Sequence, residues 1–203
     1  MLNEERLVFW ATTLVIYFII LGVSRAYEAS SLIYHLIILS LPLYLLIKKL
    51  DRLGLVKGKT RVGIYFCAIL LIFALISKYL WRLSLTGNLW YNILVGVILA
   101  SISEEILHRG YLQPKLQVRF GSTQGLLLTA LLFTLIHIPK YMFTNLFTPI
   151  NLIQVFILGV LFGFTKDESN STIYPIIAHG IWNFKLHIAT FRRTVTTRYK
   201  DSL

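Results

Sequence analysis

The sequence predicts an all-α, polytopic helical membrane protein with about six to eight transmembrane helices and a polar site inside the membrane. Of its 203 residues, 56% are hydrophobic and only 14% are charged, and the mean hydropathy is +0.70. This composition is too apolar for a water-soluble domain. Apolar runs long enough to span a bilayer recur along the chain, and ionisable residues occur within some of them. Together these observations indicate helices in lipid that surround a polar centre.

Each expected span is an apolar run of roughly 20 residues, the length that crosses a bilayer as a helix. The last run is the most polar, because it contains Pro175, His179, Asn183 and Lys185. No internal repeat of 20 to 50 residues is evident, and no loop is long enough for a second domain. The expected spans lie near 7–24, 31–47, 62–80, 89–112, 122–139, 150–165 and 172–191.

The formal net charge of +11 comes from basic residues that cluster in short segments between the apolar runs. Such clusters are typical of topology signals and of contacts with anionic lipid, so we expect membrane lipid as a partner and no nucleic acid. The loop 48–61 holds six of the twenty basic residues and should face the cytoplasm. Seven full spans would place the basic tail 192–203 outside, which conflicts with the charge bias.

The first polar motif is the stretch "EEILHR", in which Glu104, Glu105 and Arg109 follow directly after an apolar run. A charged side chain inside a span costs several kcal/mol, so each one is a candidate functional residue. Glu105 and Arg109 are four residues apart and can form an ion pair on one helix face. Glu104 is rotated about 100° from Glu105. We therefore expect Arg109 to orient Glu105, while Glu104 points into a polar cavity; the alternative is that both glutamates end the helix at the membrane surface.

Two further motifs place histidines within apolar segments. In "FTLIHIP", Phe133 and His137 lie one helical turn apart, and Pro139 should end or kink the helix. In "AHGIWNF", His179 and Asn183 share one helix face. A single histidine in an apolar helix is more often structural than functional. Three polar motifs in one small membrane domain are much harder to explain by packing.

These residue types are those that peptide hydrolysis away from bulk solvent requires. Glu104 suits a general base, and the imidazoles of His137 and His179 can position a water molecule or bind a metal. The Asn183 amide can donate to a developing oxyanion. Glu104, His137 and His179 would also form a zinc site with one open position, but the spacing is not HExxH. A divalent metal such as zinc is therefore permitted as a cofactor and not required.

The motifs "EEILHR", "FTLIH" and "HGIWN", in this order, resemble the EExxxR, FxxxH and HxxxN/D motifs of the CPBP family, the CAAX proteases and bacteriocin-processing enzymes. The resemblance covers about residues 90–190. It implies Glu104, His137, His179 and Asn183 as the catalytic residues, with Glu105, Arg109 and Phe133 supporting them. Members have been described both as metalloproteases and as glutamate-type proteases, and those with established activity cleave after the prenylated cysteine of CAAX proteins. The expected partner is therefore a membrane-associated or prenylated peptide.

The resemblance divides the chain into N-terminal transmembrane helices (1–88), a CPBP-like catalytic core (89–191) and the basic tail (192–203), all within one structural domain. We expect a multi-pass integral membrane protein of a prokaryotic plasma membrane, and the pattern specifies no oligomeric state. The leading function is that of an intramembrane endopeptidase that hydrolyses a peptide bond with glutamate-activated water.

Two alternatives belong to other classes. The first is a non-catalytic membrane scaffold or bacteriocin-immunity protein with the same fold. The second is a proton-coupled transporter, although the sequence lacks the inverted repeat that many transporters have. If the helix that carries Glu104 ends near Leu112, Glu104 lies about 12 Å below that membrane face and His137 about 22 Å. This mismatch predicts a displaced or kinked start to the helix that carries His137.

Overall fold

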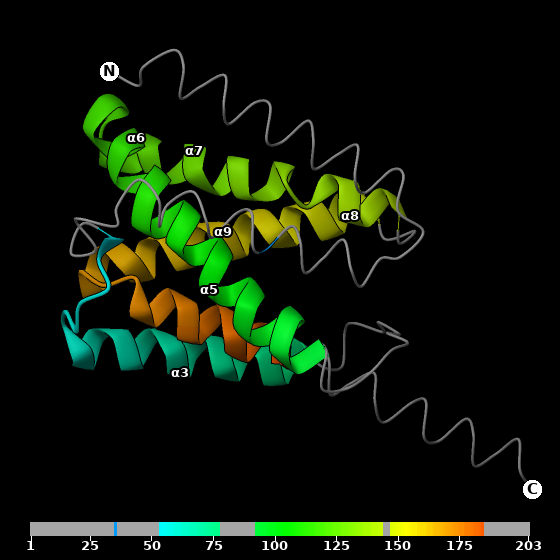
Figure 1. Ribbon diagram of the computed structural model, residues 1–203, viewed down its shortest axis with the longest axis horizontal. Helices are drawn as coiled ribbons and strands as arrows, with labels where there is room; N and C mark the ends of the chain where they lie inside the picture. The colour runs from blue at the N-terminus through cyan, green and yellow to red at the C-terminus, as the bar shows by residue number, and fades with distance from the viewer. Residues whose placement is uncertain (1–34, 36–52, 78–91, 144–146, 185–203) are drawn as a thin grey trace, which may run out of the picture.

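The computed structural model describes residue 35 and residues 53–77, 92–143 and 147–184. All regular elements within these ranges are helices, which confirms the predicted all-α class. Helices α3, α7 and α9 run lengthwise along the molecule, and the chain segment through α5 crosses them obliquely (Figure 1). The expected spans 7–24 and 31–47 lie outside the described residues, apart from His35.

The first motif lies on one long helical path that alternates between π-helical and α-helical geometry. Because a π-helix is wider than an α-helix, each change of geometry shifts the faces that its side chains occupy. The path continues beyond the expected end at Leu112 and stops at Gly121, whose φ of 88° strongly favours glycine. Pro114 lies in the first turn of the last segment, directly after the π-helical segment. The four segments are η2 (Asn92–Leu99, π), α5 (Ala100–Glu105), η3 (Ile106–Leu112, π) and α6 (Gln113–Phe120).

The expected span 122–139 is two helices, α7 (Ser122–Leu135) and α8 (Ile138–Phe143). The sequence predicted a displaced or kinked start to the helix that carries His137. The helix α7 begins at Ser122, where the sequence places it, and His137 lies in the turn that follows its end. The depth mismatch arose from ending the previous helix too early. The path continues to Phe120 and passes through the π-helical segment Ile106–Leu112, so the α-helical count from Leu112 does not apply to it. In the structure the two side chains meet, with His137 Nε2 3.8 Å from Glu104 Oε2.

The helices α3, α9 and 173–184 pack with the helical path 92–120 and α7. Helix α9 (Pro149–Ser169) begins with Thr148, whose hydroxyl accepts a hydrogen bond from Asn151 N at 3.3 Å. It contacts both α7 and α3 (Thr60–Ser77). The chain then turns at Asn170 and continues as a helix over residues 173–184.

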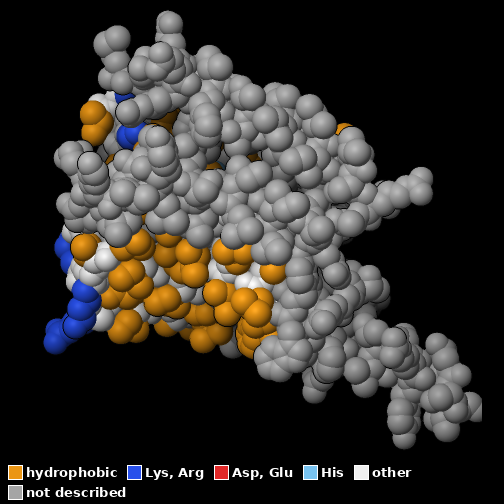
Figure 2. Space-filling view, in the orientation of Figure 1, with side chains coloured by type: hydrophobic (Ala, Val, Ile, Leu, Met, Phe, Trp, Pro, Cys, Tyr) orange, Lys and Arg blue, Asp and Glu red, His pale blue; other side chains and the backbone are white. Residues whose placement is uncertain are grey.

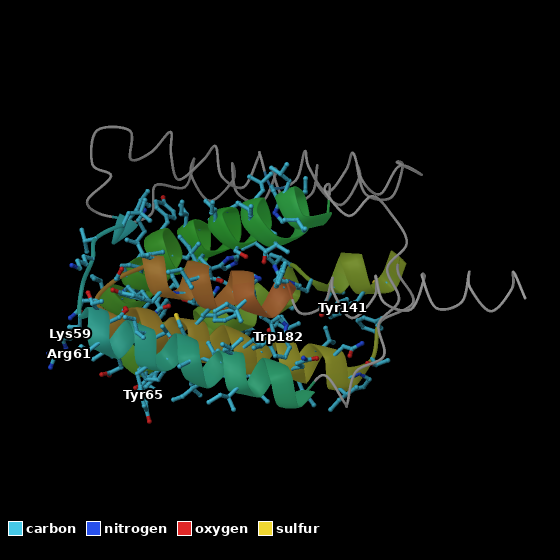
Figure 3. All side chains as sticks on the ribbon, turned by 90° about the horizontal axis from the view of Figure 1, so that it is seen from below. Lys59, Arg61, Tyr65, Tyr141 and Trp182 are labelled. Atoms are coloured by element: carbon cyan, nitrogen blue, oxygen red, sulfur yellow. The ribbon has the colours of Figure 1, made fainter. Side chains whose placement is uncertain are left out.

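The basic loop before α3 is fixed to the turn between the last two helices. Thr172 donates from its backbone N–H to Gly54 O at 2.8 Å and from its hydroxyl to Leu53 O at 2.7 Å. The Tyr174 hydroxyl donates to Lys57 O at 2.9 Å. Gly58 has a φ of +57°, and a Cβ there would collide with the Ser169 carbonyl. This end of the bundle also carries Lys59 and Arg61 at the start of α3 (Figure 3).

Many large apolar side chains are exposed, and the interior holds polar and charged side chains beside apolar ones, as in a protein in lipid. Figure 2 shows an apolar face over α3 that is flanked at one end by basic side chains. Within the described residues, α9 is long and apolar enough to cross a bilayer, and Thr60–Ile72 and α7 are shorter apolar helices. Exposed apolar residues include Ile64 and Ile72 on α3, Leu127 and Leu131 on α7, and Ile153 and Ile157 on α9.

Candidate functional site

The two adjacent glutamates end α5, immediately before the π-helical segment η3. Glu104 is 6% exposed and Glu105 is fully buried. Short π-helical segments within α-helices often accompany functional sites. Both carboxylates are therefore inside the bundle, and the alternative that they merely end a helix at the membrane surface does not describe their position.

Glu105 pairs with Arg109, as their spacing predicts. Arg109 Nε lies 3.1 Å from Glu105 Oε2, and Arg109 Nη1 donates to Oε1 at 3.2 Å. The guanidinium is fully buried and lies over the ring of Phe133, 4.5 Å from its centroid, with Phe162 at 5.5 Å. Paired charges and aromatic faces lower the cost of burying this cation.

Arg109 also begins a series of contacts between the long helical path and α9, which we call the polar ladder. It consists of Arg109 Nη2 to Gly159 O at 2.8 Å, Gln113 Nε2 to Gly163 O at 3.1 Å, and Gln117 Nε2 to Asp167 Oδ2 at 2.6 Å. Each step advances one helical turn on both partners. Gly163 lets Gln113 approach α9 closely, because a Cβ there would lie 2.9 Å from Gln113 Oε1, whereas Gly159 faces Ala130 on α7. The polar ladder thus fixes the helix of the glutamates against α9.

His179 connects the two carboxylates. Its Nδ1 lies 2.8 Å from Glu105 Oε1, and its Nε2 lies 3.9 Å from Glu104 Oε2. Glu105 therefore contacts His179 as well as Arg109. The sequence suggested that it pairs with Arg109 while Glu104 alone points into the polar cavity. A carboxylate on Nδ1 fixes the ring orientation and places the hydrogen on that nitrogen. The ring also stacks on Phe162, with a centroid distance of 5.0 Å.

His137 reaches Glu104 from the break between α7 and α8. Its Nε2 lies 3.8 Å from Glu104 Oε2, and its Nδ1 lies 2.7 Å from Phe133 O. The Phe133 ring is buried against His137, with a centroid distance of 4.7 Å. Phe133 therefore contacts both His137 and Arg109, one through its carbonyl and ring and the other through its ring face.

For neutral imidazoles, the hydrogen-bond partners of His137 and His179 assign the same tautomer to both. Nδ1–H of His137 donates to a carbonyl, and Nδ1–H of His179 donates to a carboxylate, so each Nε2 presents a lone pair. These lone pairs converge on Glu104 Oε2, which is also an acceptor. The distances of 3.8 and 3.9 Å lie between one and two hydrogen-bond lengths. Converging acceptors suit a small group with polar hydrogens, such as a water molecule, whose two hydrogens reach two of the three acceptors at a time.

Asn183 lies half-buried one turn beyond His179, and its Nδ2 donates to Gly96 O at 3.0 Å. Nδ2 carries two hydrogens, and this carbonyl accepts one of them. The Asn183 contact joins the helix 173–184 to η2. The printed contact of the Asn183 side chain is thus with the backbone of η2, one turn along the helix from His179.

Glu104, His137 and His179 are also the residues that a zinc ion would need. In the part of the chain that the structure describes, no group of three or more His, Cys, Asp or Glu side chains is arranged to hold a metal ion, so these three residues do not fit a zinc site.

Two buried histidines beside Glu104 are absent from the sequence prediction. His35 Nδ1 lies 3.8 Å from Glu104 Oε1 and 3.0 Å from Ser103 Oγ. His108 Nδ1 lies 2.7 Å from Glu104 O, a contact that supports the backbone. An ionisable residue within the apolar segment 31–47 was the signal for His35. We call His35, Glu104, His137 and His179 the imidazole cluster.

Comparison with known proteins supports the resemblance seen in the motifs. Residues 86–185, about half of the chain, match the family model described as type II CAAX prenyl endopeptidase Rce1-like. The match includes all three motifs and excludes His35. No curated protein and no solved structure shows a significant match.

Proposed function

Because the chain belongs to the CPBP family, we propose that it is an intramembrane endopeptidase in which Glu104 activates a water molecule. The observation that carries this proposal is the convergence of His137 Nε2 and His179 Nε2 on Glu104 Oε2. A general base needs such a position, in reach of the water whose proton it takes.

In the proposed reaction, the water donates one hydrogen to Glu104 Oε2 and the other to the Nε2 of one of the two histidines. Glu104 takes one proton, and the water oxygen bonds to the carbonyl carbon of the scissile peptide. The second N–H of Asn183 donates to the oxyanion that develops. The C–N bond then breaks, and the proton on Glu104 passes to the amine nitrogen. The products are a carboxylic acid and an amine.

Glu105 and Arg109 have a supporting role in this scheme. Glu105 orients His179 through the 2.8 Å contact at Nδ1, and Arg109 compensates the charge of Glu105. Phe133 accepts from His137 and covers the Arg109 guanidinium. Small displacements of a catalytic group lower rates strongly, so these contacts contribute through geometry.

The substrate class follows from the apolar exterior and from the family. A multi-pass protein whose polar groups are buried within helices receives its substrate from the membrane or its surface. We propose a lipid-modified peptide, cleaved after a prenylated cysteine, as the substrate.

The test compares one peptide with and without a prenyl group. The purified protein in detergent is incubated with a prenylated CAAX peptide and with its unprenylated form. Each incubation is run with and without a chelator. The products are identified by mass spectrometry. We expect cleavage of the prenylated peptide at an unchanged rate in the chelator. Cleavage that stops in the chelator and returns with zinc contradicts the metal-independent mechanism, and no cleavage of either peptide favours the non-catalytic scaffold.

A further inference from the structure

His35 contacts the carboxylate of Glu104 from outside the family-matched residues 86–185. It is 5% exposed, and its Nδ1 approaches Oε1, whereas His137 and His179 approach Oε2. The two oxygens of Glu104 therefore have different neighbours. In the proposed reaction only the Oε2 side holds the water.

The contact with Ser103 indicates which ring nitrogen of His35 carries the hydrogen. The Ser103 hydroxyl donates to Ala100 O at 3.2 Å, so its oxygen is available as an acceptor. His35 Nδ1 lies 3.0 Å from that oxygen, and in the tautomer with the hydrogen on Nδ1 it donates to it. Ser103 is fully buried, which makes the pair a fixed contact inside the bundle. The same Nδ1–H group lies 3.8 Å from Glu104 Oε1.

We propose that His35 is a positioning residue of the site, whose Nδ1–H, anchored on Ser103 Oγ, holds Glu104 with Oε2 directed at His137 and His179. This inference rests on the proposed function of Glu104. An N–H dipole beside Oε1 stabilises one orientation of the carboxylate, and the bond to Ser103 fixes the dipole. The N-terminal part of the chain thus completes a site whose three motifs lie within residues 86–185.

Three variants of His35 separate positioning from packing. His35→Asn keeps an N–H donor at the position of Nδ1, His35→Gln moves the donor to the position of Nε2, and His35→Ala removes it. We expect His35→Ala and His35→Gln to lower kcat by about tenfold or more with little change in KM. His35→Asn should restore most of kcat. A purely structural imidazole would not distinguish the two amides.

A second measurement tests the contact without any substrate. Thermal unfolding in detergent is followed for His35→Ala, Ser103→Ala and the double variant. If the two residues bond to each other, the second substitution costs little once the first is made. Additive losses would overturn the contact on which the proposal depends.

The outcomes separate this proposal from the proposed function. If the parent is active and His35→Ala cleaves at the full rate, the role of His35 is wrong and the proposed function stands. If His35→Gln restores kcat as well as His35→Asn does, the assignment to Nδ1 is wrong. A parent that cleaves no prenylated peptide removes the proposed function and the role of His35 together. In that case the unfolding experiment still decides whether His35 and Ser103 are bonded.

Discussion

The helical path 92–120 contributes Arg109, Gln113 and Gln117 to the polar ladder and Glu104 to the imidazole cluster, and the two groups differ in their contact distances. The ladder consists of direct hydrogen bonds of 2.6 to 3.1 Å between side chains of the path and α9. In the cluster, the three histidines stand 3.8 to 3.9 Å from the oxygens of Glu104. Glu105 belongs to the ladder side, because its contacts with Arg109 and His179 measure 2.8 to 3.2 Å.

This difference separates two uses of buried polar groups. Direct bonds between paired groups fix helix positions, because an unpaired buried charge or amide is costly. Acceptors held apart around one carboxylate oxygen leave a position for a reactant. Substitutions in the ladder should therefore change stability, and substitutions in the cluster should change cleavage.

The largest stability effect is expected for Glu105→Gln. The amide removes the charge that pairs with Arg109, a fully buried guanidinium. Leaving a buried charge unpaired costs about 3–5 kcal/mol, so the thermal midpoint in detergent should fall markedly. The double variant Glu105→Gln with Arg109→Met removes both charges and should recover part of this loss. An unchanged thermal midpoint in Glu105→Gln would contradict the stabilising role that separates Glu105 from Glu104.

An intermediate effect is expected where α9 approaches α7. A Cβ at Gly159 would lie 3.2 Å from Ala130 Cα, so Gly159→Ala must push the helices apart. Overpacking of this kind costs about 1–3 kcal/mol. Gly180→Ala is the matched control, because a Cβ there meets only Ser101 Oγ at 3.7 Å. The control should gain about 0.5–1 kcal/mol from helix propensity, and equal thermal midpoints for the two variants would contradict this packing.

The smallest effect is expected within the ladder itself, for Gln113→Met. The substitution loses the hydrogen bond to Gly163 O, which contributes about 1 kcal/mol. It also removes Gln113 Oε1, a buried oxygen without a hydrogen-bond partner among the described residues. Because the two changes oppose each other, thermal unfolding should shift by the equivalent of about 1 kcal/mol or less. A loss as large as that of Glu105→Gln would show that the ladder acts as one network.

Spacing along the sequence predicted the local parts of the site. The i, i+4 relation of Glu105 and Arg109 is set by helix geometry, so their ion pair is confirmed. The meeting of Glu104 with His137 and His179 followed from the cost of isolated polar groups in lipid, and the distances agree with it. The catalytic roles of these residues remain predictions.

Contacts between distant segments were not predictable in the same way. The polar stretch after Leu112 suggested the end of a span, whereas the helix continues to Phe120 because Gln113 and Gln117 find partners on α9. His35 has no motif partner in its own segment, so only the packed structure shows that it reaches Glu104. Lengths counted along separate helices also fail to give a common depth where the helices cross obliquely (Figure 1).

The most direct test of the account is the cleavage rate of Glu104→Gln. The amide keeps the size and hydrogen-bonding capacity of the side chain but removes the base, and an uncharged group is easier to bury. We expect cleavage of the prenylated peptide to fall about 10²-fold or more while the thermal midpoint stays close to that of the parent. Full activity in Glu104→Gln, measured on a substrate that the parent cleaves, would contradict the role of Glu104 as the base.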